Sequence, residues 1–188
     1  MLFVLLLAVL ELSWLHESAT TSCQIPKDGG SGKCITCYPG NEIDDDHCYA
    51  CSVGQYSYFG ILCRPCSEGT FANETGQALC YSCNAGTFQD AVGMSSCKSC
   101  NIGEYSLAYA SSCTACPVGT YQNLSAQSSC NACPAGTYNN AVSKTSLSDC
   151  LPCPVNSTGG QGASACNCSS SYYFDGSQCI SNVLQLYA

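Results

Sequence analysis

Residues 113–121 read Cys-Thr-Ala-Cys-Pro-Val-Gly-Thr-Tyr, and residues 130–138 repeat this pattern as Cys-Asn-Ala-Cys-Pro-Ala-Gly-Thr-Tyr. Eight Cys-x2-Cys pairs occur along the 188-residue chain, and their first cysteines lie 14 to 20 residues apart. A nearly constant period of this kind indicates one small unit that is copied many times. The pairs are Cys34/Cys37, Cys48/Cys51, Cys63/Cys66, Cys80/Cys83, Cys97/Cys100, Cys113/Cys116, Cys130/Cys133 and Cys150/Cys153.

Six of the units share a glycine three residues after the second cysteine and an aromatic ring two residues after the glycine. We expect the glycine to turn the chain sharply, because it tolerates a positive φ. The segment that ends in the ring then predicts a short strand, and the ring would lie over the bridge as the whole hydrophobic core of its unit. These structural positions are Gly54 and Tyr56, Gly69 and Phe71, Gly86 and Phe88, Gly103 and Tyr105, Gly119 and Tyr121, and Gly136 and Tyr138.

The first and last units depart from this signature. The first keeps Gly40 but has Glu42 in place of the ring, and the last has Asn156 and Thr158 at the two positions. Repeat arrays often end in atypical units, so we interpret both as divergent ends.

The composition predicts that disulfides, rather than one large core, stabilise the chain. Cysteine accounts for 20 of the 188 residues, and Cys23, Cys166, Cys168 and Cys179 complete the set outside the pairs. So high a cysteine content marks a disulfide scaffold, and we expect all twenty cysteines to be bridged. The predicted fold class is therefore small and disulfide-rich, an elongated tandem array of short β-hairpin and loop modules with little regular secondary structure.

The N-terminal apolar run, residues 1–10, is too short to span a bilayer and fits the hydrophobic region of a secretory signal peptide. We expect a signal peptide over 1–22, divergent cysteine-rich units over 23–50, tandem repeats over 51–153, and a divergent unit with a tail over 154–188. No membrane segment other than the signal is expected. The predicted protein is secreted and extracellular, or is the ectodomain fragment of a longer membrane protein.

Four Asn-x-Ser/Thr sequons agree with an extracellular glycoprotein, although such sequons also arise by chance. The predicted acceptors are Asn73, Asn123, Asn156 and Asn167. Asn167 precedes Cys168, and a bridge at that cysteine would hinder modification of the asparagine.

The unit quoted first resembles the ephrin-receptor-like cysteine-rich repeat, whose pattern is Cys-x2-Cys-Pro-x-Gly-Thr-Tyr followed by a polar loop. The resemblance covers roughly residues 34–166. The unit is also similar to the growth-factor-receptor and tumour-necrosis-factor-receptor cysteine-rich modules. Among the six units with the glycine and the ring, proline is absent after four of the second cysteines, namely Cys51, Cys66, Cys83 and Cys100, so those copies are divergent. The resemblance implies a non-catalytic extracellular array.

Sequence alone leaves the disulfide connectivity open, because many pairings of these cysteines are possible. The repeat favours a ladder in which each pair's second cysteine joins the next pair's first, and the related receptor module supports this choice. The favoured bridges are Cys37–Cys48, Cys51–Cys63, Cys66–Cys80, Cys83–Cys97, Cys100–Cys113, Cys116–Cys130, Cys133–Cys150 and Cys153–Cys166, with Cys23–Cys34 and Cys168–Cys179 at the ends.

The leading functional hypothesis is a protein-binding or spacer array whose partner is an extracellular protein ligand or matrix component. The net charge of −8 argues against nucleic-acid binding, which needs basic patches. No set of residues that could form a catalytic centre is visible, so we expect neither an enzyme nor a cofactor. Two alternatives stay open, a structural matrix or surface-coat protein and a thiolate metal-binding protein. Aromatic residues outside the repeat position either cap neighbouring disulfides or form an interface, and the candidate interface residues among them are Tyr58, Phe59, Tyr172, Tyr173 and Phe174.

Overall fold

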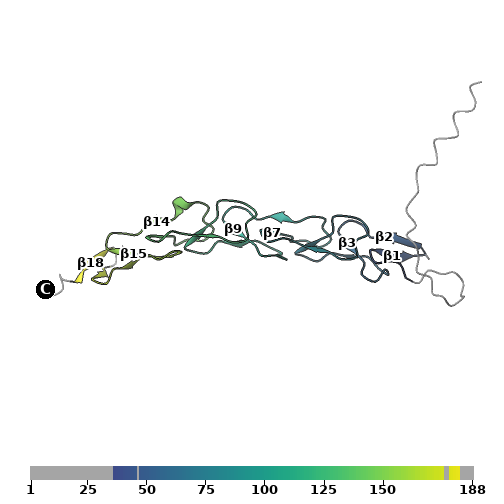
Figure 1. The fold of residues 1–188 in the computed structure, drawn as a ribbon, viewed down its shortest axis with the longest axis horizontal. Helices are drawn as coiled ribbons and strands as arrows, with labels where there is room; N and C mark the ends of the chain where they lie inside the picture. Colours follow the sequence, from purple (N-terminus) through teal and green to yellow (C-terminus); the bar gives the residue numbers. More distant parts are fainter. Residues whose placement is uncertain (1–35, 46, 176–177, 183–188) are drawn as a thin grey trace, which may run out of the picture.

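The computed structural model describes residues 36–45, 47–175 and 178–182, and these form an elongated row of small units (Figure 1). The predicted fold class is confirmed, because the described chain consists of nine antiparallel two-stranded sheets that follow one another along the row. The first hairpin lies at one end of the row, and the last, which contains β18, lies at the other.

Each sheet is a hairpin of two consecutive strands. In chain order, the strands are β1 (Asn41–Asp44) with β2 (His47–Ala50), β3 (Gln55–Tyr56) with β4 (Arg64–Pro65), β5 (Thr70–Phe71) with β6 (Tyr81–Ser82), β7 (Thr87–Phe88) with β8 (Lys98–Ser99), β9 (Glu104–Tyr105) with β10 (Thr114–Ala115), β11 (Thr120–Tyr121) with β12 (Asn131–Ala132), β13 (Thr137–Tyr138) with β14 (Leu151–Pro152), β15 (Ser157–Thr158) with β16 (Asn167–Cys168), and β17 (Tyr172–Phe174) with β18 (Cys179–Ser181). One short 3-10 helix, η1 (Leu147–Asp149), lies in the longest loop.

The Cys-x2-Cys spacing has a direct structural reason in the inner repeats. The two residues between the cysteines form the second strand of a hairpin, as in β12, where Tyr121 pairs with Asn131 and Thr120 with Ala132. The first strand begins with a tight turn. There the hydroxyl of Thr120 donates to the Pro117 carbonyl at 2.7 Å, and the Thr120 N–H donates to the same oxygen at 3.1 Å. The threonine before the ring therefore closes the turn that follows the cysteine.

Nine disulfides follow the ladder that the repeat favours. Their Cα–Cα distances, from 5.4 Å for Cys51–Cys63 to 5.8 Å for Cys116–Cys130, lie in the ordinary range. No cysteine among the described residues is free. The tenth expected bridge, Cys23–Cys34, lies outside the described residues, as does the predicted signal peptide. The nine bridges are Cys37–Cys48, Cys51–Cys63, Cys66–Cys80, Cys83–Cys97, Cys100–Cys113, Cys116–Cys130, Cys133–Cys150, Cys153–Cys166 and Cys168–Cys179.

The expectation that the ring forms the whole core of its unit is wrong. All six rings are only half-buried, whereas the second cysteine of each inner unit is almost fully buried. The residue directly after the ring is also buried, and in five of the six units it is polar. These residues are Ser57, Ala72, Gln89, Ser106, Gln122 and Asn139. A single ring on so thin a hairpin keeps one face in solvent, and the cysteine and its polar neighbour fill the interior.

The buried polar side chains are satisfied by backbone groups. The Gln122 amide donates to the Ser129 carbonyl at 2.8 Å and accepts the Leu124 N–H at 3.1 Å, which ties together the ends of its own loop. The Asn139 amide instead donates to the Thr120 carbonyl of the preceding unit at 2.9 Å. A buried amide costs stability unless it is paired, so these residues order both the loops and the junctions between units.

Consecutive units are joined by backbone hydrogen bonds that recur along the array. The Gly119 N–H donates to the Asn139 carbonyl of the next unit at 2.7 Å, and the Gly119 carbonyl accepts the Cys133 N–H at 2.9 Å. The Gly86 N–H and carbonyl bind Ser106 and Cys100 in the same way. The repeat glycine is therefore a hydrogen-bonding hub between neighbouring units as well as a turn residue.

Units two positions apart also touch. A Cβ built on each covered glycine would overlap a loop carbonyl from two units further along the chain. The six covered glycines and the residues that supply the carbonyls are Gly40 and Gly76, Gly54 and Gly93, Gly69 and Tyr109, Gly86 and Ala126, Gly103 and Ser143, and Gly119 and Gly162. Since each covered glycine also has a positive φ, between 74° and 88°, no other residue fits there without strain.

Candidate interaction surface

The unit closed by Cys51–Cys63 carries the most concentrated group of exposed apolar side chains near one groove. Its loop contains Tyr58, Phe59, Ile61 and Leu62, with exposed fractions of 56, 74, 52 and 57%. Exposed apolar residues are common singly, but a contiguous patch on a soluble chain marks an interaction site.

The loop has this shape because of a serine and a glycine. The Ser57 hydroxyl is buried and accepts the Gly60 N–H at 3.1 Å, while Gly60 has a φ of 69°. The Gly60 carbonyl in turn accepts the Cys37 N–H at 2.9 Å, which fixes the loop to the preceding unit. These two hydrogen bonds fix the backbone of the short loop, and its large side chains lie at the surface.

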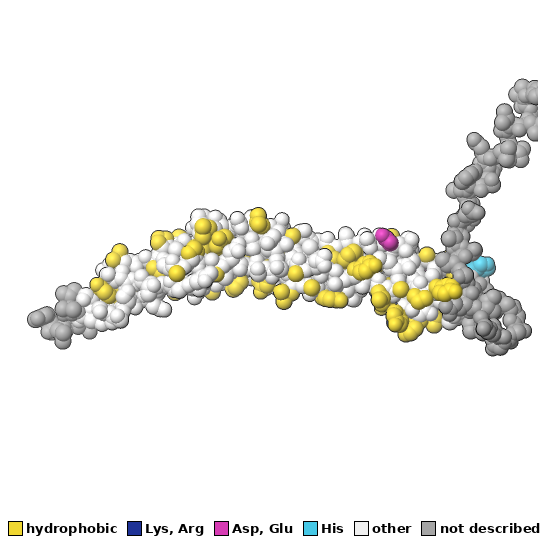
Figure 2. All heavy atoms as spheres, viewed as in Figure 1, with side chains coloured by type: hydrophobic (Ala, Val, Ile, Leu, Met, Phe, Trp, Pro, Cys, Tyr) yellow, Lys and Arg dark blue, Asp and Glu magenta, His cyan; other side chains and the backbone are white. Residues whose placement is uncertain are grey.

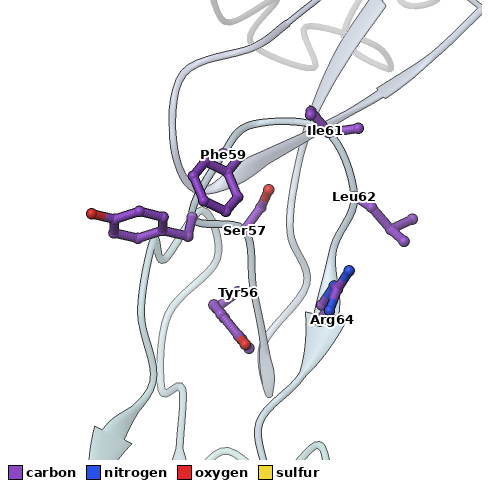
Figure 3. Close-up of a pocket in the computed structure, with 7 residues that line it drawn as sticks. Tyr56, Ser57, Phe59, Ile61, Leu62 and Arg64 are labelled. Atoms are coloured by element: carbon purple, nitrogen blue, oxygen red, sulfur yellow. The ribbon is translucent and has the colours of Figure 1, made fainter.

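The loop and the hairpin beneath it enclose a shallow groove of about 300 Å³. In Figure 3, Phe59, Ile61 and Leu62 belong to the loop, and Tyr56 and Arg64 belong to the two strands of the hairpin. The rings of Tyr58 and Phe59 meet edge to face, with centroids 4.9 Å apart. We call these seven residues, Tyr56, Ser57, Tyr58, Phe59, Ile61, Leu62 and Arg64, the β3–β4 groove.

The structure brings together only some of the candidate interface residues. Tyr58 and Phe59 contact each other in the β3–β4 groove, whereas Tyr172, Tyr173 and Phe174 form β17 at the other end of the array (Figure 1). Phe174 is 65% exposed, but Tyr172 and Tyr173 are half-buried. The two aromatic clusters are therefore separate surfaces.

Ile61, Leu62 and Arg64 were not among the sequence candidates. Isolated aliphatic residues in a loop carry no signal of their own, and Arg64 stands between two cysteines like any other strand residue. The fact that Arg64 is the sole arginine of the chain, next to an aromatic pair, was the available signal.

Apolar side chains are also scattered along the whole length of the array, with little charge among them on the face in view (Figure 2). The four sequon asparagines, Asn73, Asn123, Asn156 and Asn167, are all exposed. No helix in the part of the chain that the structure describes has the length and apolar character needed to cross a membrane. Within the same residues, no group of three or more potential metal ligands is found.

Comparison with known families confirms the resemblance over the central repeats. Residues 69–106 and 103–150 match the family model described as tyrosine-protein kinase ephrin type A/B receptor-like. No curated protein matches the chain. The two matches are in tandem and together span residues 69–150, where consecutive disulfides follow the same ladder, so these units are similar to ephrin-receptor-like cysteine-rich repeats.

Proposed function

We propose, from these tandem ephrin-receptor-like repeats, that the chain is an extracellular, non-catalytic binding array that presents its β3–β4 groove to a protein partner. The observation that carries the proposal is the gathering of four large exposed apolar side chains on a loop that a buried serine and a backbone bond hold rigid. Rigid apolar and aromatic side chains bind partners at a low cost in conformational entropy.

Two further observations support the location. Nine disulfides imply an oxidising compartment, since such bonds do not persist in the cytosol. The apolar run over residues 1–10 supports entry into the secretory pathway through a signal peptide over 1–22. The acidic composition supports a protein or matrix partner rather than a nucleic acid.

The experiment is a cell-binding measurement with the folded, oxidised chain displayed in many copies on fluorescent beads. We expect saturable binding that unlabelled folded chain inhibits and that brief trypsin treatment of the cells removes. Reduced and alkylated chain is the matched control, because it has the same sequence without the array. Two results would contradict the proposal and favour a structural coat. One is the absence of saturable binding on a broad panel of cells and matrix proteins, and the other is assembly of the chain into insoluble polymers.

A further inference from the structure

Arg64 is the only lysine or arginine of the described chain without an acidic partner. The side chain of Lys98 lies 2.6 Å from the Asp90 carboxylate, and that of Lys144 lies 3.4 Å from Asp149. Arg64 is exposed and forms no such ion pair.

The repeat explains why Arg64 is unpaired. Arg64 and Lys98 occupy the same place in their units, directly after the first cysteine, and pair across the hairpin with Tyr56 and Phe88. Asp90 stands two residues after Phe88, but the corresponding residue after Tyr56 is Tyr58. The unit with the exposed aromatics therefore has no acid at the position from which Asp90 pairs with Lys98.

A carboxylate near this strand binds the backbone: Glu42 accepts the backbone N–H of Cys63 at 3.1 Å, directly before Arg64 in the chain. Because Arg64 forms no ion pair within the described residues, the donors of its guanidinium are available to another molecule at the rim of an apolar groove. Arginine beside aromatic residues is the composition most enriched where interfaces carry their binding energy.

We propose that the β3–β4 groove binds a segment of another protein in which an aspartate or glutamate stands close to an aromatic or aliphatic side chain. The carboxylate would take two hydrogen bonds from Arg64, and the apolar side chain would pack on Phe59 and Ile61. The inference rests on the proposed function, because it names the partner chemistry of that same site.

The test uses a displayed library of random peptides, selected on the folded, oxidised chain. We expect the enriched peptides to share an acidic residue within a few positions of an apolar one. Arg64→Gln and Phe59→Ser should each weaken the selected peptides by roughly tenfold or more, the loss that follows from one charged hydrogen-bonding group. Both side chains are exposed, so the variants should keep the disulfide ladder and fold.

The array offers control substitutions in another unit. Lys98 occupies the position of Arg64, and Val92, which is 59% exposed, precedes a loop glycine of positive φ, Gly93, as Phe59 precedes Gly60. Lys98→Gln and Val92→Ser should leave peptide binding unchanged. A tenfold loss in these controls would contradict the assignment, because it would place the peptides elsewhere on the array.

Other outcomes separate this inference from the proposed function. Enriched peptides without acidic residues, no enrichment, or peptides indifferent to Arg64→Gln would overturn the partner chemistry. Concentration-dependent dimerisation that Phe59→Ser abolishes would show that a second copy fills the groove, and would also overturn it. If Arg64→Gln binds cells as well as the natural chain does while Phe59→Ser does not, the groove still binds a partner and only the acidic partner chemistry fails.

Discussion

The inner units and the C-terminal units share one hairpin and one bridge, but they differ in what covers the repeat glycine. Gly119, with a φ of 79°, is buried beneath the Gly162 carbonyl from two units further along. Gly136 has a similar φ of 82°, yet it is exposed, and no described atom lies within 4 Å of a Cβ built on it. In the following unit, Asn156 takes the glycine position with a φ of 65°.

This difference explains why the first and last units of the array depart from the repeat signature in different ways. The covering carbonyl always comes from the C-terminal direction, so Gly40 at the first unit is still covered, by Gly76. The position of Asn156 requires only a residue that tolerates a positive φ, and asparagine is among the few residues that do. In the inner units the backbone conformation and the close approach both require glycine, whereas at the C-terminal end only a positive φ is required, which Asn156 also adopts.

The largest expected effect comes from removing a bridge at each place. Cys116→Ser with Cys130→Ser should destabilise its unit by about 2–5 kcal/mol, and Cys168→Ser with Cys179→Ser should do the same locally. Only the inner change should spread backwards, to unit 83–97, because Ala126 of the broken loop covers Gly86. Hydrogen exchange followed by mass spectrometry measures this spread.

Two results would break the comparison. One is exchange confined to residues 116–130 in the inner variant, which would mean that units two apart are not coupled. The other is loss of protection in the inner units of the terminal variant.

The next effect isolates the close approach from the conformation. Gly136→Ala should cost about 1–2 kcal/mol for placing an alanine at positive φ. Gly119→Ala should cost that amount and roughly a further 1–3 kcal/mol, because its methyl group would overlap the Gly162 backbone. Local opening free energies from hydrogen exchange compare the two variants directly. Equal losses would mean that the carbonyl moves aside at no cost.

A smaller effect concerns the loop residue that supplies the covering carbonyl, which also has a positive φ. Gly93 adopts 71° and Ala126 adopts 57° at this second turn. Ala126→Gly should stabilise its unit by up to about 1 kcal/mol, since the relief of strain exceeds the entropy that glycine adds to the unfolded chain. Gly93→Ala should destabilise its unit by about 1 kcal/mol, because alanine is strained at a positive φ. The added methyl group itself fits, since the Cβ would lie at an ordinary 3.5 Å from Pro65. Thermal unfolding of both variants checks the opposite signs.

The smallest effect lies in loop 133–150, where the inner array meets the C-terminal units. Partial burial raises the pKa of Asp149, but hydrogen bonds from the Ser146 N–H, Lys144 and the Thr145 N–H outweigh it, so the pKa is lowered overall. A lowered folded pKa means that Asp149 stabilises η1 above its unfolded pKa, and that this stabilisation is lost as the pH falls through the folded pKa. The amide resonances of Thr145 and Ser146 should shift with that titration.

Asp149→Asn supplies the control for this titration, because it removes the ionisable group. The two amides should then show no such acid transition. A transition that survives the substitution would assign the pH dependence to another group.

Much of the fold could be predicted because its determinants are local in sequence. The cysteine pair, the glycine and the ring lie within nine residues, as in 113–121, and the ladder links consecutive units. The buried polar position could not be predicted, because it is Ser57 in one unit and Gln89 in another, and polar residues are normally expected at the surface. Contacts between units two apart depend on the rise of the array, which no single unit encodes.

The candidate surface was predictable only in its aromatic part. Tyr58 and Phe59 stand out as adjacent aromatics outside the repeat positions. Recognising Arg64 required the strand register, which places it opposite Tyr56, and required the knowledge that its counterpart Lys98 is paired. Those relations appear only when equivalent units are superposed in space.

In the part of the chain that the structure describes, the units lie in line, and hydrogen bonds and close backbone approaches join units one and two positions apart. Small-angle X-ray scattering of the folded, oxidised chain, after treatment with a glycosidase, measures this shape. A compact chain of this length would have a radius of gyration of roughly 16 Å. The elongated array of Figure 1 should have a clearly larger radius and a pair-distance distribution with a long tail. A radius near the compact value would show that the units pack side by side and would contradict the in-line arrangement.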